Sequence, residues 1–174
     1  MAEKKAFDQD LEELDEFIDF MDADIANIRR VIQTVRESGI EADFMIHAKS
    51  ETVEESAKHT DVDEESIVKT LVFMADEPVA VLCPGHRRVS EDKLEQVTGD
   101  DVRMANPDEV EKATGYIIGG VSPFDLDIPA YMDESILEND EVKPAAGSRV
   151  VGITVDPEEL KKLVDAEEAD IAEK

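Results

Sequence analysis

The 174-residue chain carries 45 acidic side chains against 18 basic ones, a formal net charge of −27. So acidic a domain repels itself in dilute buffer and suits a salt-rich cytosol, where the Debye length falls to about 3 Å at 1 M. Because the acids are interleaved with regular apolar periods, the composition predicts a folded, halophilic protein rather than a disordered one.

Three further features restrict the class of protein. The single cysteine, Cys83, excludes a disulfide within the chain and is consistent with a reducing compartment. No apolar run approaches the roughly 18 residues of a membrane span, and the first ten residues contain no apolar signal region. We therefore expect a cytoplasmic protein without a membrane partner.

The N-terminal segment, residues 1–38, has a heptad pattern. Its apolar residues alternate at spacings of four and three, which predicts helix from about residue 8 to 36, either continuous or broken near Asp22. Gly39 ends the pattern. The stripe consists of Phe7, Leu11, Leu14, Ile18, Met21, Ile25, Ile28, Ile32 and Val35.

Two arrangements of this helix remain open. The stripe can pack on the core of its own domain. The flanking positions, acidic first (Asp8, Asp15, Asp22) and basic last (Arg29, Arg36), instead favour an antiparallel partner, within the chain or across a homodimer.

After Gly39 the pattern changes to short strands and capped helices. A strand is expected at 42–47, followed by a short helix that the capping box Thr52–Glu55 opens and that reaches about His59. A hairpin of strands 66–75 and 79–83 comes next. It is followed by a helix from Ser90 to near Gly99, a strand at 102–105 and a helix from Asn106 to Ala113.

The stretch TGYIIGGVSPFD, residues 114–125, holds three of the chain's eight glycines and a proline. Glycine serves where backbone takes φ > 0 or approaches another group closely, and proline restricts φ. The stretch is therefore interpreted as a short strand at Ile117 and Ile118 that leads into a rigid loop of bare backbone.

The rest of the chain continues the mixture. Strands are expected in IPAYMDE, near Val142 and at 148–155, and a last helix begins at Asp156 and fades into an acidic tail. The pattern predicts an α+β fold with a mixed, mainly antiparallel sheet and flanking helices. We assign a helical extension at 1–38, one domain at 39–165 and an acidic tail at 166–174.

Lys69 breaks the pattern of the predicted strand SIVKTLVFMA. Both faces of this strand are apolar, which is typical of a buried central strand, and lysine is rarely buried there without a partner. A broken local rule in a well-formed element indicates a functional residue. The alternative is a lysine that protects an edge strand from aggregation.

Four segments together resemble one known family. SIVKTLVF, PGHRRVSEDKLEQVTG, ANPDEVEKATGYIIGGVSPFD and AAGSRV occur in the order and at the spacing of the YbaK/ProX aminoacyl-tRNA deacylases, which are similar to the editing domain of prolyl-tRNA synthetases. The resemblance covers about Ile40 to Val164. It implies hydrolysis of the ester between amino acid and tRNA by water, with tRNA-Pro as the expected carrier and no metal, cofactor or covalent intermediate.

The resemblance also implies site residues. Lys69 matches the functional lysine of the family, and Gly119, Gly120, Val121, Ser122 and Pro123 match its GxxxP loop, whose backbone would face the ester opposite Lys69. Further substrate contacts expected are His47, Tyr116, Asp133, Gly147 and Ser148.

Some signals stay ambiguous. Arg87 and Arg88 either contact RNA phosphates or belong to a solvated turn, and Cys83 with His86 cannot complete a four-ligand zinc site. The acidic stretch from Phe124 to Asp127 departs from the glycine- and lysine-rich segment typical of bacterial members, which affects specificity. The alternatives to an enzyme are a non-catalytic binding module for an aminoacyl-tRNA or nucleotide and a protein-interaction role of the heptad stripe.

Overall fold

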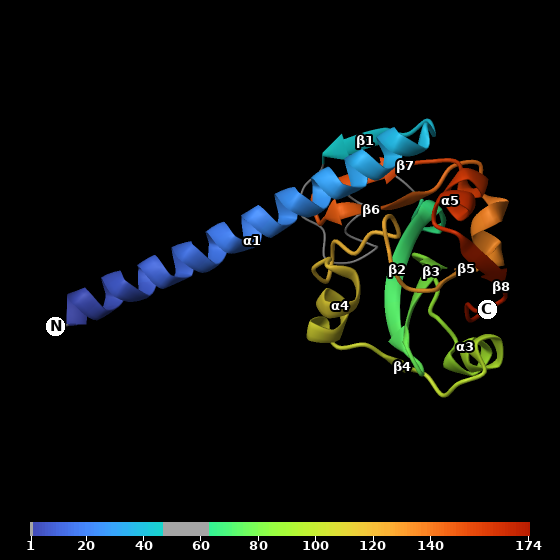
Figure 1. Ribbon diagram of the computed structural model, residues 1–174, viewed down its shortest axis with the longest axis horizontal. Coiled ribbons are helices and arrows are strands. Elements are labelled where there is room, and N and C mark those ends of the chain that lie inside the picture. The colour runs from blue at the N-terminus through green and yellow to red at the C-terminus, as the bar shows by residue number, and fades with distance from the viewer. Residues whose placement is uncertain (1, 47–62) are drawn as a thin grey trace.

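The computed structural model describes residues 2–46 and 63–174. Within these residues one mixed sheet has the strand order β1-β7-β6-β2-β3-β5-β8, and β4 pairs with β2 (Figure 1). This arrangement confirms the predicted α+β fold. The strands are β1 (Asp43–Ile46), β2 (Ile67–Met74), β3 (Pro78–Pro84), β4 (Arg103–Met104), β5 (Ala130–Asp133), β6 (Lys143–Ser148), β7 (Val151–Thr154) and β8 (Ala166–Ala169).

The hairpin of β2 and β3 forms the centre of the sheet. The two strands pair antiparallel from Val68 opposite Pro84 to Met74 opposite Pro78, as their apolar patterns predict. Strand β2 also pairs with β6 on its other side, so it is a central strand. The interpretation of Lys69 as a protective lysine on an edge strand is therefore wrong.

Three helices begin where their capping residues predict. The Ser90 side chain accepts a hydrogen bond from the Lys93 amide at the start of α3 (Glu91–Thr98). Asn106 forms a capping box with Glu109 at the start of α4 (Pro107–Thr114). The Asp156 carboxylate caps α5 (Pro157–Leu163). Two short 3₁₀ helices, η1 and η2, span Glu64–Ser66 and Glu134–Glu138.

Helix α1 (Ala2–Ser38) is continuous, without a break at Asp22. Its C-terminal part lies against β6 and buries Val31 and Val35 in the main core. Its N-terminal part projects away from the body (Figure 1), and the stripe residues from Leu11 to Ile25 stay 39–55% exposed. The stripe thus packs on the domain's own core only over its last residues.

The predicted strand at Ile117 and Ile118 is wrong. Gly115 ends α4 with φ 74°, and a turn follows in which the Gly120 amide donates to the Ile117 carbonyl. Tyr116 is buried in the core, where its hydroxyl is satisfied by donating to the Phe124 carbonyl. The apolar pair therefore belongs to a folded-back loop rather than to a ladder.

The interpretation of residues 166–174 as an acidic tail is also wrong. Strand β8 pairs parallel with β5, and Ile171 and Ala172 are buried. Glu167 and Glu168 remain exposed, so the segment exposes its acidic residues and buries its apolar ones, as a packed edge strand does.

The predicted short helix at 52–59 lies outside the described residues.

Candidate functional site

A cavity of about 390 Å³ opens between β2, the β6–β7 hairpin, α4 and the glycine loop, which we define as residues 115–124. Six consecutive residues of β2, from Ile67 to Val72, line it. Neighbouring side chains of a strand point to opposite faces, so a consecutive run can line a cavity only along the edge of the strand. The cavity therefore lies where the sheet separates beside β2.

The pairing of β2 explains this gap. Strand β2 pairs with β6 at Ile67 and Val68 and with β4 at Phe73 and Met74, while no described strand pairs with the segment between them on that side. The Gly85 amide donates to the Ile67 carbonyl on the β3 side, and the Ala105 amide donates to the Val72 carbonyl on the other side. By this alternation the backbone N–H and C=O of Thr70 point toward the cavity.

Thr70 also has a polar side chain without a partner. Its hydroxyl is buried and makes no hydrogen bond within the described part of the chain. Buried hydroxyls in proteins are nearly always paired, so an unpaired one beside a cavity indicates a ligand position. Sequence reasoning missed Thr70, although a hydroxyl inside an otherwise apolar strand was the available signal.

The three glycines of the loop serve three different contacts. Gly115, in the left-handed region, ends α4. A Cβ on Gly119, where φ is 93°, would lie 2.2 Å from Nε of Arg149, and a Cβ on Gly120 would lie 2.9 Å from Cα of Ser148. The bare backbone therefore lets the loop pack directly on the β6–β7 hairpin.

The second predicted glycine loop is an irregular strand end. Gly147 and Ser148 belong to β6, where the register with β7 shifts between Ala145 and Ser148. A Cβ on Gly147 would lie 2.7 Å from the backbone of Asn27, so this bulge packs on α1. Ser148 is among the residues that line the cavity, and its hydroxyl donates to Oδ2 of Asp24 at 2.5 Å.

The sequence predicted that the Lys69 ammonium lies opposite the glycine loop, but it lies elsewhere. It donates to the carbonyl of Arg87, beyond the end of β3. Lys69 also sits opposite Cys83 in the hairpin, whereas Val68 and Val72, on the other face of β2, pack in one core with Val121 of the loop. Alternation along the strand thus separates the lysine side chain from the loop, and Lys69 reaches the cavity at the strand edge.

Asp133 lies outside the cavity lining. Its carboxylate accepts from the amides of Ile171 and Ala172 at 3.0 and 2.7 Å and from the amide and hydroxyl of Ser135. Burial raises the pKa of Asp133, but these hydrogen bonds outweigh it and the net pKa is lowered. The position indicates an anchor for the C-terminal segment.

Tyr116 is likewise enclosed. Its hydroxyl donates to the Phe124 carbonyl at 2.7 Å, and burial raises the pKa of Tyr116 to about 12. The guanidinium of Arg30 lies over its ring, 4.2 Å from the centroid.

Of the predicted site residues, Lys69, Gly119, Val121 and Ser148 line the cavity together. Gly120 and Gly147 support its walls from behind, as their close backbone contacts show. His47 lies outside the described residues. The remaining predicted residues do not line the cavity: Tyr116, Ser122, Pro123, Asp133, Arg87 and Arg88.

The charged residues of the cavity wall are all basic within the described chain, despite the overall charge of −27. They are Lys69, Lys143 and Arg149. Lys143 donates to Thr154 Oγ1 at 2.9 Å, and Arg149 donates through Nε and Nη2 to the Ile118 carbonyl at 3.2 and 3.0 Å. Sequence reasoning missed Lys143 and Arg149, although an isolated basic residue in an acidic chain was the available signal.

The described residues contain no cluster of metal-ligating side chains.

The cavity of this mixed-sheet domain is largely apolar, with a basic wall, bare backbone and an unpaired hydroxyl. Such a cavity is suited to a small acyl group attached to an anion. The model of the aminoacyl-tRNA editing domain matches residues 47–163, and the chain belongs to this family. The chain accordingly has the activity of that family, hydrolytic deacylation of aminoacyl-tRNA.

The chain is similar to two curated proteins and to one solved structure. The uncharacterized protein YwhH of Bacillus subtilis (strain 168) is 37% identical over 118 residues, 66% of this chain and 75% of YwhH. A protein of Enterococcus faecalis (strain ATCC 700802 / V583), EbsC, named as a candidate Cys-tRNA(Pro)/Cys-tRNA(Cys) deacylase, is 31% identical over 74% of this chain and 79% of its own.

A solved crystal structure, described as a candidate trans-editing enzyme for prolyl-tRNA synthetase, has a TM-score of 0.77 and 32% identity. The alignment covers 85% of this chain and 98% of that one. The resemblance stated from the four sequence segments is therefore confirmed. Among the described helices, none is long and apolar enough to cross a membrane.

Proposed function

We propose that the protein is a cytoplasmic trans-editing enzyme that binds mischarged tRNA-Pro and removes its amino acid, without a metal or a covalent intermediate. The observation that carries the proposal is the cavity, which combines apolar walls with the unpaired hydroxyl of Thr70. Its volume of about 390 Å³ lies in the range of small-ligand sites and suits one aminoacyl group with its ribose.

The reaction needs the ester carbonyl held in place and an attacking water. The Thr70 hydroxyl and backbone N–H are donors at the strand edge, and such fixed donors stabilise the negative charge that develops on a carbonyl oxygen. Water adds to the carbonyl carbon, the ester C–O bond breaks, and the proton lost by water passes to the ribose oxygen. The products are the free amino acid and the uncharged tRNA.

Lys143 and Arg149 are assigned to the terminal phosphate of the tRNA, because both belong to the β6–β7 hairpin beside the cavity. The Lys69 ammonium, held by the Arg87 carbonyl, adds positive potential from the other face of β2. Fixed cations of this kind attract a phosphodiester even in an acidic protein because their neighbourhood, rather than the net charge, determines the local field.

Lys69→Ala in single-turnover deacylation of mischarged tRNA-Pro tests the function. We expect a loss on the order of 10²-fold, the scale of one fixed electrostatic contact, with an unchanged circular dichroism spectrum. Lys162→Ala, which removes an exposed lysine of α5, is the matched control. Full activity of folded Lys69→Ala would overturn the role of Lys69, whereas a wild-type chain that binds aminoacyl-tRNA without hydrolysing it would favour the binding-module alternative.

The acidic composition supports a salt-adapted protein. At −27 the folded state repels itself in dilute buffer, and this repulsion is screened at molar salt. The thermal midpoint should therefore rise between 0.1 and 3 M KCl. A midpoint that does not change over this range contradicts halophilic adaptation.

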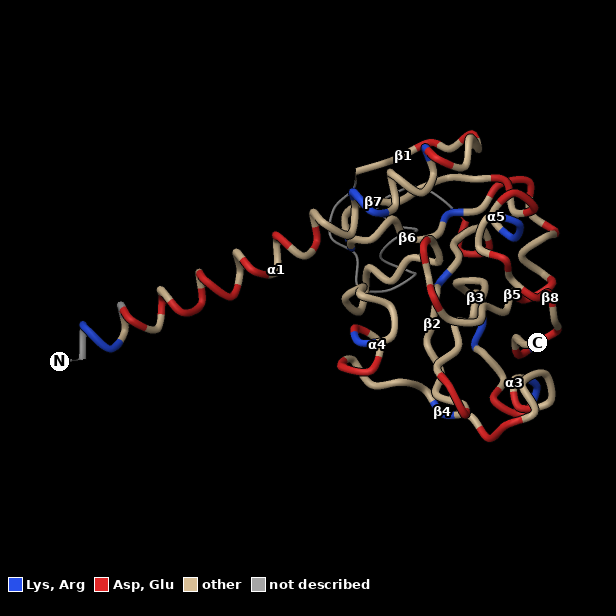
Figure 2. Tube along the Cα trace, viewed as in Figure 1, with Lys and Arg blue, Asp and Glu red and all other residues tan. Residues whose placement is uncertain are grey.

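The projecting part of α1 is assigned to a second copy of the chain. Leu11, Leu14 and Ile18 are exposed on it, and an antiparallel copy would place the acidic flank of one helix beside exposed Arg29 and Arg36 of the other. Figure 2 shows how strongly acidic this helix is, so association should increase with salt. Light scattering of the full chain and of a chain lacking residues 1–21 tests this, and a full-length monomer at 2 M KCl contradicts it.

A further inference from the structure

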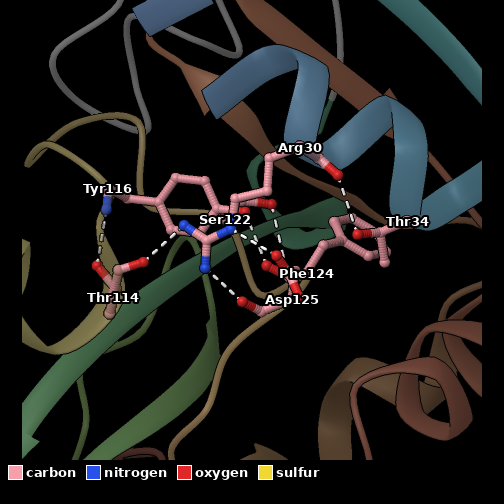
Figure 3. Close-up of polar contacts among 7 residues, drawn as sticks. All are labelled: Arg30, Thr34, Thr114, Tyr116, Ser122, Phe124 and Asp125. Atoms are coloured by element: carbon pink, nitrogen blue, oxygen red, sulfur yellow. Dashed lines mark hydrogen bonds and ion pairs between the residues drawn. The ribbon is translucent and has the colours of Figure 1, made fainter. Parts of the chain in front are cut away.

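On the face of α1 that lies against the glycine loop, one arginine contacts both ends of that loop (Figure 3). We propose that Arg30 is a positioning residue for deacylation. Its side chain closes the base of the glycine loop and thereby fixes the cavity wall. The inference rests on the proposed function for its effect on rate, while the closure itself can be measured without substrate.

The contacts of Arg30 span the loop. Nη1 donates to the Thr114 carbonyl at 2.7 Å, at the end of α4 where the loop begins. Nε donates to the Asp125 carboxylate at 2.8 Å, and Nη2 donates to the Asp125 carbonyl, directly after the loop. A single guanidinium thus joins residues that are 11 positions apart in the chain.

The bridge is supported from inside the loop. The Tyr116 ring lies under the guanidinium, and its hydroxyl donates to the Phe124 carbonyl, so a second link crosses the loop one layer deeper. A planar, delocalised cation can stack on a ring and donate to several acceptors at once, whereas a lysine ammonium cannot. Arginine is therefore the side chain that this geometry requires.

Asp125 adopts an uncommon backbone conformation at the end of the loop. Its φ is 56°, in the left-handed region, which few residues with a side chain adopt and which aspartate tolerates better than most. The ion pair with Arg30 and the hydrogen bond to its own carbonyl hold it there. Loss of Arg30 would remove both restraints at the point where the loop ends.

Closure at the base determines the position of the cavity wall. Gly119 and Val121 line the cavity from within the closed loop, and Gly120 rests on the backbone of Ser148. Ser148 in turn bonds Asp24 of α1. The same helix therefore holds the loop through Arg30 and the opposite wall through Asp24, so it sets their separation.

The test compares Arg30→Ala and Arg30→Lys with the wild-type chain. Amide hydrogen exchange of residues 115–124 reports closure, and single-turnover deacylation at increasing enzyme concentration separates the rate constant from the apparent binding constant. We expect exchange of the loop to accelerate about tenfold or more in Arg30→Ala. The rate constant should fall by about 10- to 100-fold, as small misplacements of a site do, with apparent binding changed less than about threefold.

Arg30→Lys and two further variants sharpen the comparison. Arg30→Lys keeps the charge but not the fork of donors, so it should recover only part of the rate. Lys112→Ala removes an exposed positive charge from α4, just before the loop, and should change neither exchange nor rate. In the Arg30→Ala/Asp125→Asn double variant, the loss should not exceed that of Arg30→Ala alone, because both residues act in one bridge.

The outcomes are distinguishable. Unchanged exchange of the loop in Arg30→Ala overturns the closure, whatever the activity. Faster exchange with an unchanged rate constant overturns the positioning role and leaves Arg30 with a purely structural one. A wild-type chain that deacylates no tRNA overturns the proposed function, and the exchange experiment then still decides whether Arg30 closes the loop.

Discussion

Replacing Gly120 by alanine inserts one methyl group between the two walls of the site. The added carbon would lie 2.9 Å from Cα, 3.0 Å from N and 3.1 Å from C of Ser148. Unstrained carbon atoms stay about 3.5–4.0 Å apart, so the walls must separate by roughly 0.6 Å (3.5 − 2.9). The obstacle is backbone, which cannot rotate aside as a flexible side chain can.

Two magnitudes follow from this separation. Overpacking of a tight contact costs about 1–3 kcal/mol, which lowers the thermal midpoint by about 2–12 °C in a domain of this size. A shift approaching 1 Å at a catalytic wall can reduce the rate by as much as about 10²-fold. We therefore expect Gly120→Ala to lose about 10- to 100-fold in single-turnover deacylation under conditions where it remains folded.

Gly99→Ala is the matched control. Gly99 has a φ of 79° at the end of α3, and a Cβ there would meet no atom within 4 Å. The substitution costs about 1–2 kcal/mol in backbone strain but touches no part of the site. It should lower the midpoint by a similar amount and leave deacylation unchanged. Wild-type stability and rate in Gly120→Ala would refute the argument that bare backbone holds the two walls together.

Three further predictions concern single groups. Thr70→Val removes an unpaired hydroxyl, so stability should stay the same or rise while deacylation falls about tenfold, the worth of one hydrogen bond; a slower rate caused by unfolding would contradict this. Burial raises the pKa of the Cys83 thiol to about 11, so iodoacetamide at pH 8 should leave the folded chain unmodified and label it rapidly in denaturant. The folded state favours the neutral phenol of Tyr116, whose pKa rises from 10.0 to about 12. Stability should accordingly decrease between pH 10 and pH 12, which denaturant titrations monitored by phenolate absorbance can measure.

Local signals accounted for much of the fold. Ser90, Asn106 and Asp156 each mark the start of a helix, because capping depends on residues within one turn. The hairpin of β2 and β3 followed equally from two apolar runs and a polar turn. The failures occurred where distant contacts decide. Ile117 has strand propensity, but no described strand pairs with it. The acidic composition of 166–174 concealed a segment that pairs with β5 in the sheet.

The site residues likewise fall into those that local sequence reveals and those that depend on distant contacts. Lys69 and the glycine loop could be found because they break local rules and match family segments. The direction of the Lys69 ammonium could not, since it depends on the Arg87 carbonyl, 18 positions away. Thr70 became a candidate only when the gap beside β2 was visible. Arg30 contacts residues 84 and 95 positions away, a relation that no window of sequence contains.

The pairing of the sheet has a consequence for the order of folding. Strand β2 can form its hairpin with β3 early, because only three residues separate the two strands. Its other neighbour, β6, begins at Lys143, and β1 waits for β7 at Val151–Thr154. Pairings of such large sequence separation close slowly. The cavity edge of β2 should thus remain accessible to solvent in a partly folded chain until the β6–β7 hairpin and α1 have docked, and the glycine loop can take its final position only in that last step.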